Sequence, residues 1–331
     1  MHKNEEDNST ANLPFMKRQF RLQESLFRKY GIFIFLLLLV IVASISSPAF
    51  LKTQNIIDIL TQVSALGMVS IGQTFVILTG RVGLDLSVAS VMATVAVIMA
   101  NLTGGEDSLF LPVALLCLIF GTGVGLFNGL LVTKRRVPPF MATLGMMIIL
   151  QGLRFIYTSG APKGNFPPIL RVLGTGSIGL IPISVISLGI LTVIAAFFLK
   201  KTILGRQIYV TGGNTNVAFL SGYRVAGIIT LAYMVSGLMA AIGGLYLAGW
   251  VGIADNWVGE GYELDSIAAT VMGGASLQGG KGGILGTIAG VLIIKMLYNL
   301  VLILHLPLQL QLIIKGIVIV LAASFWVLKR S

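Results

Sequence analysis

The feature that most constrains this chain is a series of long apolar runs separated by short polar segments. Ten runs approach or reach the length of about 17–25 residues that a helix needs to cross the hydrocarbon core of a bilayer. Only 11% of the residues are charged and 56% are hydrophobic, whereas soluble domains carry about 25% charged residues. The sequence therefore predicts an all-α integral membrane protein. Its predicted spans are residues 31–47, 56–79, 84–101, 110–133, 140–158, 177–199, 226–250, 263–278, 283–304 and 308–328.

The eighth run, residues 263–278, has the weakest pattern of a span. It is short and rich in glycine, and it opens with Glu263 and Asp265. We expect either a plain span or a broken, re-entrant element. A re-entrant backbone is stable at membrane depth only where it is buried in protein or lines a water-filled cavity.

The distribution of positive charge predicts the orientation. Three lysines and arginines lie in segments predicted to be outside (Lys52, Lys163, Arg171), and three fall within spans (Arg154, Lys295, Lys315). The others, out of 23 in total, lie on the opposite side. Cytoplasmic loops carry the excess of Lys and Arg, so both termini are predicted to be cytosolic in a multi-pass protein of the cytoplasmic (inner) membrane.

The spans divide the chain into a basic cytosolic segment (1–30), a transmembrane region (31–328) and a short cytosolic C-terminus (329–331). Residues 17–30 form either a basic amphipathic helix on lipid or a disordered tail that only sets the topology. The net charge of +11 does not predict nucleic-acid binding, because the basic residues lie between apolar runs and are not interleaved with aromatics.

A polar, glycine-punctuated segment at about 200–225 stands out within the apolar sequence. It has basic residues at both ends and a short helix-like stretch, 215–220, in its middle. A loop that only connects two spans needs no such order. We therefore expect this segment to be the surface that a soluble partner contacts.

The sequence offers little for catalysis or for binding a metal. Cys117 is alone in a span, and the two histidines are His2 and His305. The stretch 275–282 resembles a phosphate-binding loop, but it has Ala275 in place of the first glycine and Gly282 in place of the Ser or Thr that follows the lysine. We expect no catalytic residue, no metal and no cofactor bound by this chain.

Two segments of the sequence, five predicted spans apart, are similar to each other. The segment that starts at Leu84-Asp85-Leu86-Ser87 resembles the one that starts at Leu264-Asp265-Ser266. Each precedes a row of glycines at four-residue spacing, which lets helix backbones approach closely. Because five is an odd number of spans, the two segments would have opposite orientations in the membrane, which predicts two inverted-topology repeats. The alternative is that small residues recur in any membrane protein. The glycine rows are Gly121, Gly125 and Gly129, and Gly282, Gly286 and Gly290.

Polar residues near the starts of these repeats are candidates for a translocation path or gate. An ionised Asp at the centre of a spanning helix costs about 2.5–3.5 kcal/mol, so such residues tend to face a cavity or a partner. They can equally cap the helices that they open, and Asn128 can simply bond a neighbouring helix. The candidates are Asp85, Ser87, Asn128, Glu263, Asp265 and Ser266.

Several separated motifs together resemble one family. They are Val76-Ile77-Leu78-Thr79 before Leu84-Asp85-Leu86-Ser87; Asn128-Gly129 with Pro139-Phe140 and Thr143-Leu144-Gly145; Gly212-Gly213-Asn214 with Leu220-Ser221-Gly222; and Gly261-Tyr262-Glu263-Leu264-Asp265-Ser266 continuing to Gly279-Gly280-Lys281-Gly282. In order and spacing, from about residue 48 to 325, they resemble the permease subunit of ribose-type ATP-binding-cassette sugar importers. The chain departs from the family in the two extra residues before Asp85 and in Gln151, where arginine is common.

The resemblance implies a type II-like importer permease. Two permease chains, identical or paralogous, form the pore, an ABC ATPase subunit binds ATP and Mg and docks from the cytosol, and an extracytoplasmic sugar-binding protein delivers a monosaccharide. The coupling element of the family corresponds here to Gly205, Arg206, Gly212, Gly213, Asn214, Ala218, Leu220, Ser221 and Gly222.

Two other classes stay open at this point. A stand-alone secondary transporter also has inverted repeats, but it needs ion-coupling carboxylates in mid-span, and the acidic residues here lie mostly at span ends. An intramembrane enzyme needs a nucleophile with a base or a metal cluster, for which the chain has few residues.

Overall fold

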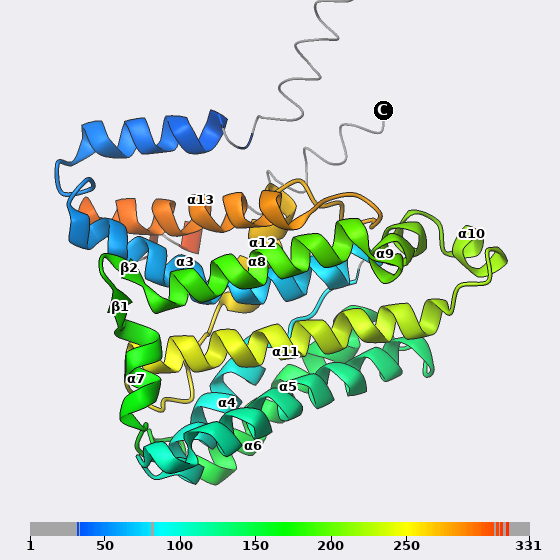
Figure 1. The fold of residues 1–331 in the computed structure, drawn as a ribbon, viewed down its shortest axis with the longest axis horizontal. Helices are drawn as coiled ribbons and strands as arrows, with labels where there is room; N and C mark the ends of the chain where they lie inside the picture. The colour runs from blue at the N-terminus through cyan, green and yellow to red at the C-terminus, as the bar shows by residue number, and fades with distance from the viewer. Residues whose placement is uncertain are drawn as a thin grey trace, which may run out of the picture.

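The computed structural model describes residues 32, 34–80, 83–307, 309–310, 312–313 and 316–317. Within this part, long helices run roughly side by side along one axis (Figure 1). The elements are α3 (Thr53–Leu78), α4 (Val88–Thr103), η1 (Asp107–Leu109), α5 (Phe110–Thr133), α6 (Pro139–Thr158), α7 (Pro168–Thr175), β1 (Ser177–Ile178), β2 (Ile181–Pro182), α8 (Ile183–Lys201), α9 (Ile203–Gly213), α10 (Thr215–Leu220), α11 (Val225–Val251), α12 (Tyr262–Met272) and α13 (Ile284–Ile303).

Six segments in the described part are long and apolar enough to cross a membrane: α3, η1 with α5, α6, α8, α11 and α13. Two shorter apolar helices accompany them, Ile34–Ser46 and α4. The prediction of ten spans is therefore not confirmed. The all-α membrane architecture is confirmed, since the only strands in the described residues form the two-residue antiparallel pair β1–β2.

Three predicted spans differ from what the sequence suggested. The span 84–101 is the 16-residue helix α4, which starts only at Val88. The span 263–278 is the 11-residue helix α12 followed by a turn, so the re-entrant alternative describes it better. Residues 177–182, predicted to begin a span, form the β1–β2 hairpin before α8. Most of the predicted span 308–328 and all of residues 1–30 and 329–331 lie outside the described residues.

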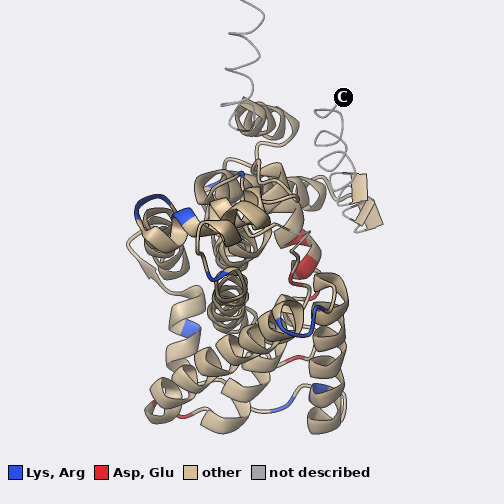
Figure 2. Cartoon of the chain, turned by 90° about the vertical axis from the view of Figure 1, so that its right-hand side faces the viewer, with Lys and Arg blue, Asp and Glu red and all other residues tan. Residues whose placement is uncertain are grey.

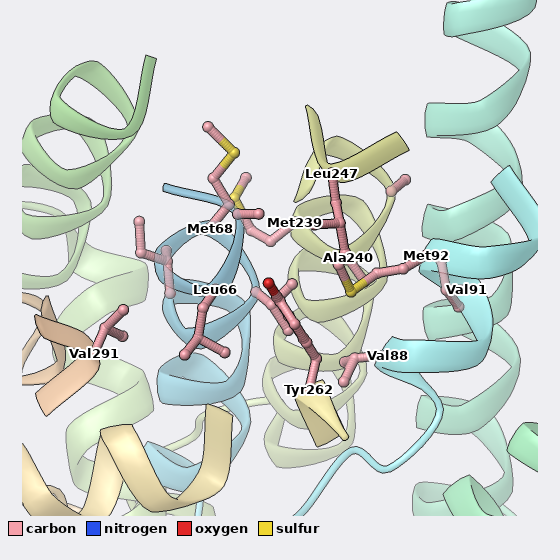
Figure 3. Close-up of a cluster of buried hydrophobic side chains, with 14 of the residues drawn as sticks. Leu66, Met68, Val88, Val91, Met92, Met239, Ala240, Leu247, Tyr262 and Val291 are labelled. Carbon is pink, nitrogen blue, oxygen red and sulfur yellow. The ribbon is translucent and has the colours of Figure 1, made fainter. Parts of the chain in front are cut away.

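Helices α3 and α11 form the centre of the bundle. From Val63 to Leu78 every residue of α3 is buried, while α5, α6 and α8 keep wide apolar faces exposed. Figure 3 shows the core between these central helices, where side chains of α3, α4, α11, α12 and α13 meet around Leu66, Met92 and Met239. Because a bilayer solvates apolar surface, the exposed faces of the outer helices indicate contact with lipid or with another membrane chain.

Glycines allow two close helix contacts. On α5, the glycines at 121, 125 and 129 approach the backbone of α11 at Gly237, Tyr233 and Thr230. On α13, Gly286 and Gly290 approach Gly273 and Ala269 at the end of α12. Gly282 belongs to the turn before α13, with φ 135°, and packs against Ala275.

The two short helices both begin inside the helical layer. The segment after α3 turns back until Asp85 lies beside Gln73, which is five residues before the end of α3, or about 7.5 Å at 1.5 Å per residue. Tyr262, at the start of α12, meets Lys295 of α13, eight residues, or about 12 Å, from the end of that helix. Each short helix thus starts where irregular backbone is covered by protein.

The molecule has two distinct ends. One, called the α10 end here, holds the C-terminal ends of α3, α5 and α8, the N-terminal ends of α6, α11 and α13, and the projecting α9 and α10 (Figure 1). The opposite end, called the hairpin end, holds α7, β1–β2 and the segments 104–109, 159–167 and 252–261. Figure 2 views the molecule from the α10 end, with Lys and Arg in blue in several of the nearest loops.

Candidate functional site

Asp85 is fully buried in the segment that leads into α4. Its Oδ1 accepts hydrogen bonds from the Ser87 backbone N–H at 3.0 Å and from the Ser87 hydroxyl at 2.6 Å. The Gln73 amide, in the orientation that satisfies both partners, donates to Asp85 O and accepts from Asp85 N, each at 3.2 Å. The carboxylate thus fixes the turn that leads into α4. It does not cap the helix itself, because the N-cap is Ser87 and α4 receives no side-chain cap bond.

Asn128 of α5 completes this group, which we call the Asp85 cluster (Gln73, Asp85, Ser87, Asn128). Its side-chain N–H donates to Ser87 Oγ at 2.9 Å, while its buried Oδ1 receives no hydrogen bond within the described chain. The preceding Leu84 O accepts from Tyr233 at 3.3 Å and from Thr143 at 3.4 Å. Four helices therefore fix this segment: α3, α5, α6 and α11.

The other three candidates, Glu263, Asp265 and Ser266, lie within the first five residues of α12. Ser266 is fully buried and donates to Glu263 O at 3.1 Å. Asp265 is buried and accepts from the Tyr298 hydroxyl of α13 at 2.9 Å. The structure thus places the six candidates in two groups, one at the start of each short helix.

A buried lysine accompanies Asp265. Lys295 of α13 is 7% exposed, and its Nζ lies 3.5 Å from the Tyr262 hydroxyl, 4.5 Å from the centre of the Tyr262 ring and 5.7 Å from that of Tyr298. Aromatic faces attract a cation more strongly when it is desolvated. The Lys295 cluster (Tyr262, Asp265, Lys295, Tyr298) thus places opposite charges and two phenols together at the depth where α12 begins.

A third polar group surrounds Arg154 of α6, which is 6% exposed. Its guanidinium donates to Ser90 O at 2.8 Å, to Thr94 Oγ1 at 3.2 Å and to Asn256 O at 3.3 Å. Arg154 therefore ties α6 to α4 and to the segment between α11 and α12.

Replacing Arg154 with lysine should destabilise this junction. The lysine ammonium keeps the positive charge. It lacks the planar guanidinium that donates to acceptors on both α4 and the segment between α11 and α12. Each lost hydrogen bond to a charged group is worth about 1.5–3 kcal/mol, so we expect a clear fall in the thermal unfolding midpoint in detergent. Arg171→Lys, at an exposed position, is the control, and equal midpoints for the two variants would show that the junction does not depend on the fork.

The polar segment at 200–225 folds into two helices. Helix α9 begins at the Thr202 cap, whose side chain accepts from Gly205 N at 3.0 Å. Asn214 then caps α10 by accepting from Asn216 N at 2.9 Å and from Val217 N at 3.1 Å. The predicted helix at 215–220 is confirmed, whereas the helical form of 203–213 was not predicted.

Helix α10 projects from the bundle (Figure 1), and three of its apolar side chains are exposed. Val217, Phe219 and Leu220 are 50%, 72% and 83% exposed, while Ala218 is buried. Gly222, with φ 79°, turns the chain back toward α11. Exposed apolar patches of this kind mark contacts with another protein or with a membrane surface.

Sequence reasoning missed several residues of these sites. Gln73, Tyr233 and Tyr298 lie inside apolar runs, Tyr262 was noted only as part of a motif, and Lys295 only as a charge within a span. A polar or ionisable residue inside a spanning segment is itself the signal that would have found Gln73 and Lys295. The tyrosines carry no such signal, because their role depends on which helix faces them.

Comparison with known proteins places these features in a family. A family described as "Branched-chain amino acid transport system / permease component" matches residues 55–323. The chain is 40% identical to the ribose import permease protein RbsC of Bacillus subtilis over 306 residues, 90% of this chain and 92% of the relative. It is 39% identical to RbsC of Escherichia coli K12 over 291 residues, 87% and 90% of the two chains.

A relative named for another sugar is similar over the same extent. The galactose/methyl galactoside import permease protein MglC of Escherichia coli K12 is 35% identical over 320 residues, 91% of this chain and 94% of the relative. No solved structure matches the chain. The match across most of both chains, together with the helical membrane architecture, shows that this chain belongs to the family of ribose-type ATP-binding-cassette import permeases.

Proposed function

We propose that this chain is the permease subunit of an importer that carries a monosaccharide across the cytoplasmic membrane. The observation that carries the proposal is the similarity, at 35–40% identity over about nine-tenths of the chain, to permeases named for ribose and galactose import. Hydrolysis of ATP would occur on a separate ATPase subunit, which would bind ATP and Mg, with no cofactor held by this chain.

The charge distribution supports an orientation with the α10 end in the cytosol. Cytoplasmic loops are enriched in Lys and Arg, and on the described residues of the hairpin end only Lys52, Lys163 and Arg171 are basic. The α10 end is richer, and both chain termini would then be cytosolic. Its basic residues within the described chain are Lys134, Arg135, Arg136, Lys200, Lys201, Arg206, Arg224 and Lys281.

In this orientation α10 would be the element that enters the ATPase. Its exposed Phe219 and Leu220 offer an apolar contact, and Arg206 and Arg224 flank it with positive charge. The hairpin end would then face the sugar-binding protein. The exposed Leu180 at the β1–β2 turn (74% exposed) lies on that side.

The order of the helices supports two inverted repeats. Helices α3, α4 and α5 are a long helix, a short helix that starts inside the layer, and a second long helix. Helices α11, α12 and α13 have the same order, and α11 and α13 run opposite to α3 and α5 between the two ends. We propose that the Asp85 cluster and the Lys295 cluster, at the starts of the two short helices, form the gate of the sugar path.

A second permease chain is part of this proposal. Helix α6 is exposed over most of its length, and its Gly145 and Gly152 have no neighbour within 4 Å of an added Cβ in the described chain. The two glycines are seven residues, or about two turns, apart and therefore lie on one face of the helix. Small residues on such a face allow close contact with another helix.

The direct test is purification of the tagged chain from its native membrane in mild detergent, with its partners identified by mass spectrometry. Recovery of an ATPase with phosphate-binding loops, together with a second permease chain, is expected. Absence of any ATPase from a folded, intact preparation would contradict the proposal. The binding protein of the same transporter can then be screened with ribose, other pentoses and hexoses.

Replacing Leu220 with aspartate should remove the ATPase from this preparation. A carboxylate at the most exposed apolar position of α10 would be buried without a partner in the contact, which costs several kcal/mol. We expect at least a tenfold loss of co-purified ATPase, equivalent to about 1.4 kcal/mol, with an unchanged amount of permease. Leu180→Asp, at the opposite end, should leave the ATPase bound; loss of ATPase in both variants would contradict the assignment of α10.

A further inference from the structure

Three segments meet backbone to backbone at the α10 end. They are the end of α3 with Gly80, the end of α9 with Gly212, and the turn 276–282 that precedes α13. The Gly280 N–H donates to Leu78 O at 3.0 Å, and Leu78 O also lies against Gly212. We call the four glycines at this point, Gly80, Gly212, Gly279 and Gly280, the glycine junction.

No side chain separates the segments at the glycine junction. A Cβ on Gly80 would lie 2.9 Å from both Gln278 O and Gly212 O, and one on Gly280 would lie 2.7 Å from Gly213 Cα. One on Gly212 would overlap Leu78 O and lie 2.6 Å from Gly280 N. Gly80, Gly279 and Gly280 also have φ of 80°, 90° and 69°, a region that other residues adopt only at a cost.

A side-chain hydrogen bond adds to this contact. The Tyr209 hydroxyl of α9 donates to Gly282 O at 3.0 Å. Burial raises the pKa of the Tyr209 phenol above its ordinary value, so the hydroxyl stays protonated and remains a donor at physiological pH. Helix α9 is therefore held to the 276–282 turn at two places along its length.

The glycine junction is close in sequence to α10 and to both proposed gate clusters. Gly80 is five residues before Asp85, and the 276–282 turn follows α12, which carries Asp265. Gly212 is two residues before Asn214, the cap of the exposed α10. The junction thus joins the end of α9, which leads into α10, to the segment before the Asp85 cluster and to the turn after α12.

We infer that the glycine junction is a rigid coupling point that moves the starts of α4 and α12 together with α9 and α10. Backbone contacts have no rotamers that can absorb a displacement, so a shift of α9 is passed on directly to Gly80 and to the 276–282 turn. Gly80, Gly212, Gly279 and Gly280 are positioning residues on this route, and the inference rests on the proposed function.

The test uses the complete transporter, with its ATPase and binding protein, reconstituted in proteoliposomes. Gly212→Ala is compared with Gly227→Ala, a helical glycine at the same end whose added Cβ would meet only Arg224 Cβ, at 3.8 Å. We expect Gly212→Ala to lose uptake per ATP hydrolysed by about tenfold, the size of an ordinary coupling energy, when uptake and hydrolysis are measured on the same proteoliposomes. Gly227→Ala should behave as the unmodified protein.

Tyr209→Phe covers the case in which Gly212→Ala does not fold, because it removes only the hydrogen bond to Gly282 O. We expect it to lower uptake per ATP by about threefold, since a lost hydrogen bond is worth about 0.5–1.5 kcal/mol. Unchanged uptake per ATP in Tyr209→Phe, or in a folded Gly212→Ala, would overturn the inference. An unmodified chain that binds no ATPase would instead contradict the proposed function, so the two failures are distinguishable.

Discussion

Replacing Gly125 with valine should prevent stable assembly of the helical bundle. The added Cβ would overlap Tyr233 O of α11 and lie 2.7 Å from Tyr233 C and 2.9 Å from Met234 Cα. These are backbone atoms of a helix that lies at the centre of the bundle, so α5 has to move away along its whole contact with α11. Overpacking of a filled core costs about 1–3 kcal/mol and occasionally more, and we expect the upper end of that range or beyond.

The measurement is the yield of monodisperse protein in detergent, followed by its thermal unfolding midpoint. Gly123→Val is the matched control, because it lies on the same helix and its added Cβ has no neighbour within 4 Å in the described chain. Gly123→Val should yield close to the unmodified amount of protein. Similar yields and midpoints for the two valine variants would show that the α5–α11 contact does not require glycine.

Replacing Asp85 with alanine should strongly reduce uptake and lower the stability of the fold. Oδ1 accepts from Ser87 N and Ser87 Oγ, and its loss leaves buried donors unpaired at about 1–3 kcal/mol each. The first turn of α4 would lose its orientation, and with it the contact between Ser87 and Asn128. We expect uptake to fall by at least tenfold, which about 1.4 kcal/mol of lost positioning is enough to produce.

Asp85→Asn separates charge from hydrogen bonding, because an amide oxygen still accepts from Ser87. If the role is to orient α4, Asp85→Asn keeps most of the stability that Asp85→Ala loses, and the comparison is made by thermal unfolding together with uptake. Asp58→Ala, which removes an exposed hydrogen bond with Gln54, controls for the loss of a carboxylate. Normal uptake by Asp85→Ala would contradict the assignment of Asp85 to the gate.

The long helices were predictable because their apolar runs are continuous. The predicted spans 110–133 and 140–158 match α5 and α6 almost to the residue. In such runs the need to satisfy every backbone group within the bilayer leaves little choice other than helix. The glycines at 121, 125 and 129 were likewise visible as a row, although the sequence does not say that α11 is the helix they face.

The short elements were not predictable in the same way. Residues 84–87 fall in the same predicted span as the helix that follows, but the bonds of Leu84 and Asp85 to Gln73, Thr143 and Tyr233 hold them outside that helix. Residues 203–213 read as a loop because of their glycines, yet the Thr202 cap and the contact with Leu78 stabilise a helix. At 177–182, Gly179 and Pro182 permit a hairpin, but the mean hydropathy of the run predicts a span.

For the polar clusters, the sequence likewise identified single residues but not their partners on other helices. Asp85 and Asp265 were identified from their places at the start of apolar runs, and both are buried in the fold. Their partners on other helices, Asn128 for the first cluster and Tyr298 for the second, depend on helix rotation and register. Arg154 and Lys295 were predicted only to be charges within spans, since no local pattern pairs them with Asn256 or Tyr262.

The central claim is tested most directly by sugar uptake into proteoliposomes that contain the purified transporter, with ATP and Mg enclosed on the α10 side. Ribose and galactose are supplied on the hairpin side together with the binding protein. The account predicts uptake of at least one of these sugars that requires ATP and continues when ionophores collapse the ion gradients. Uptake that proceeds without ATP and stops when the gradients collapse would contradict it.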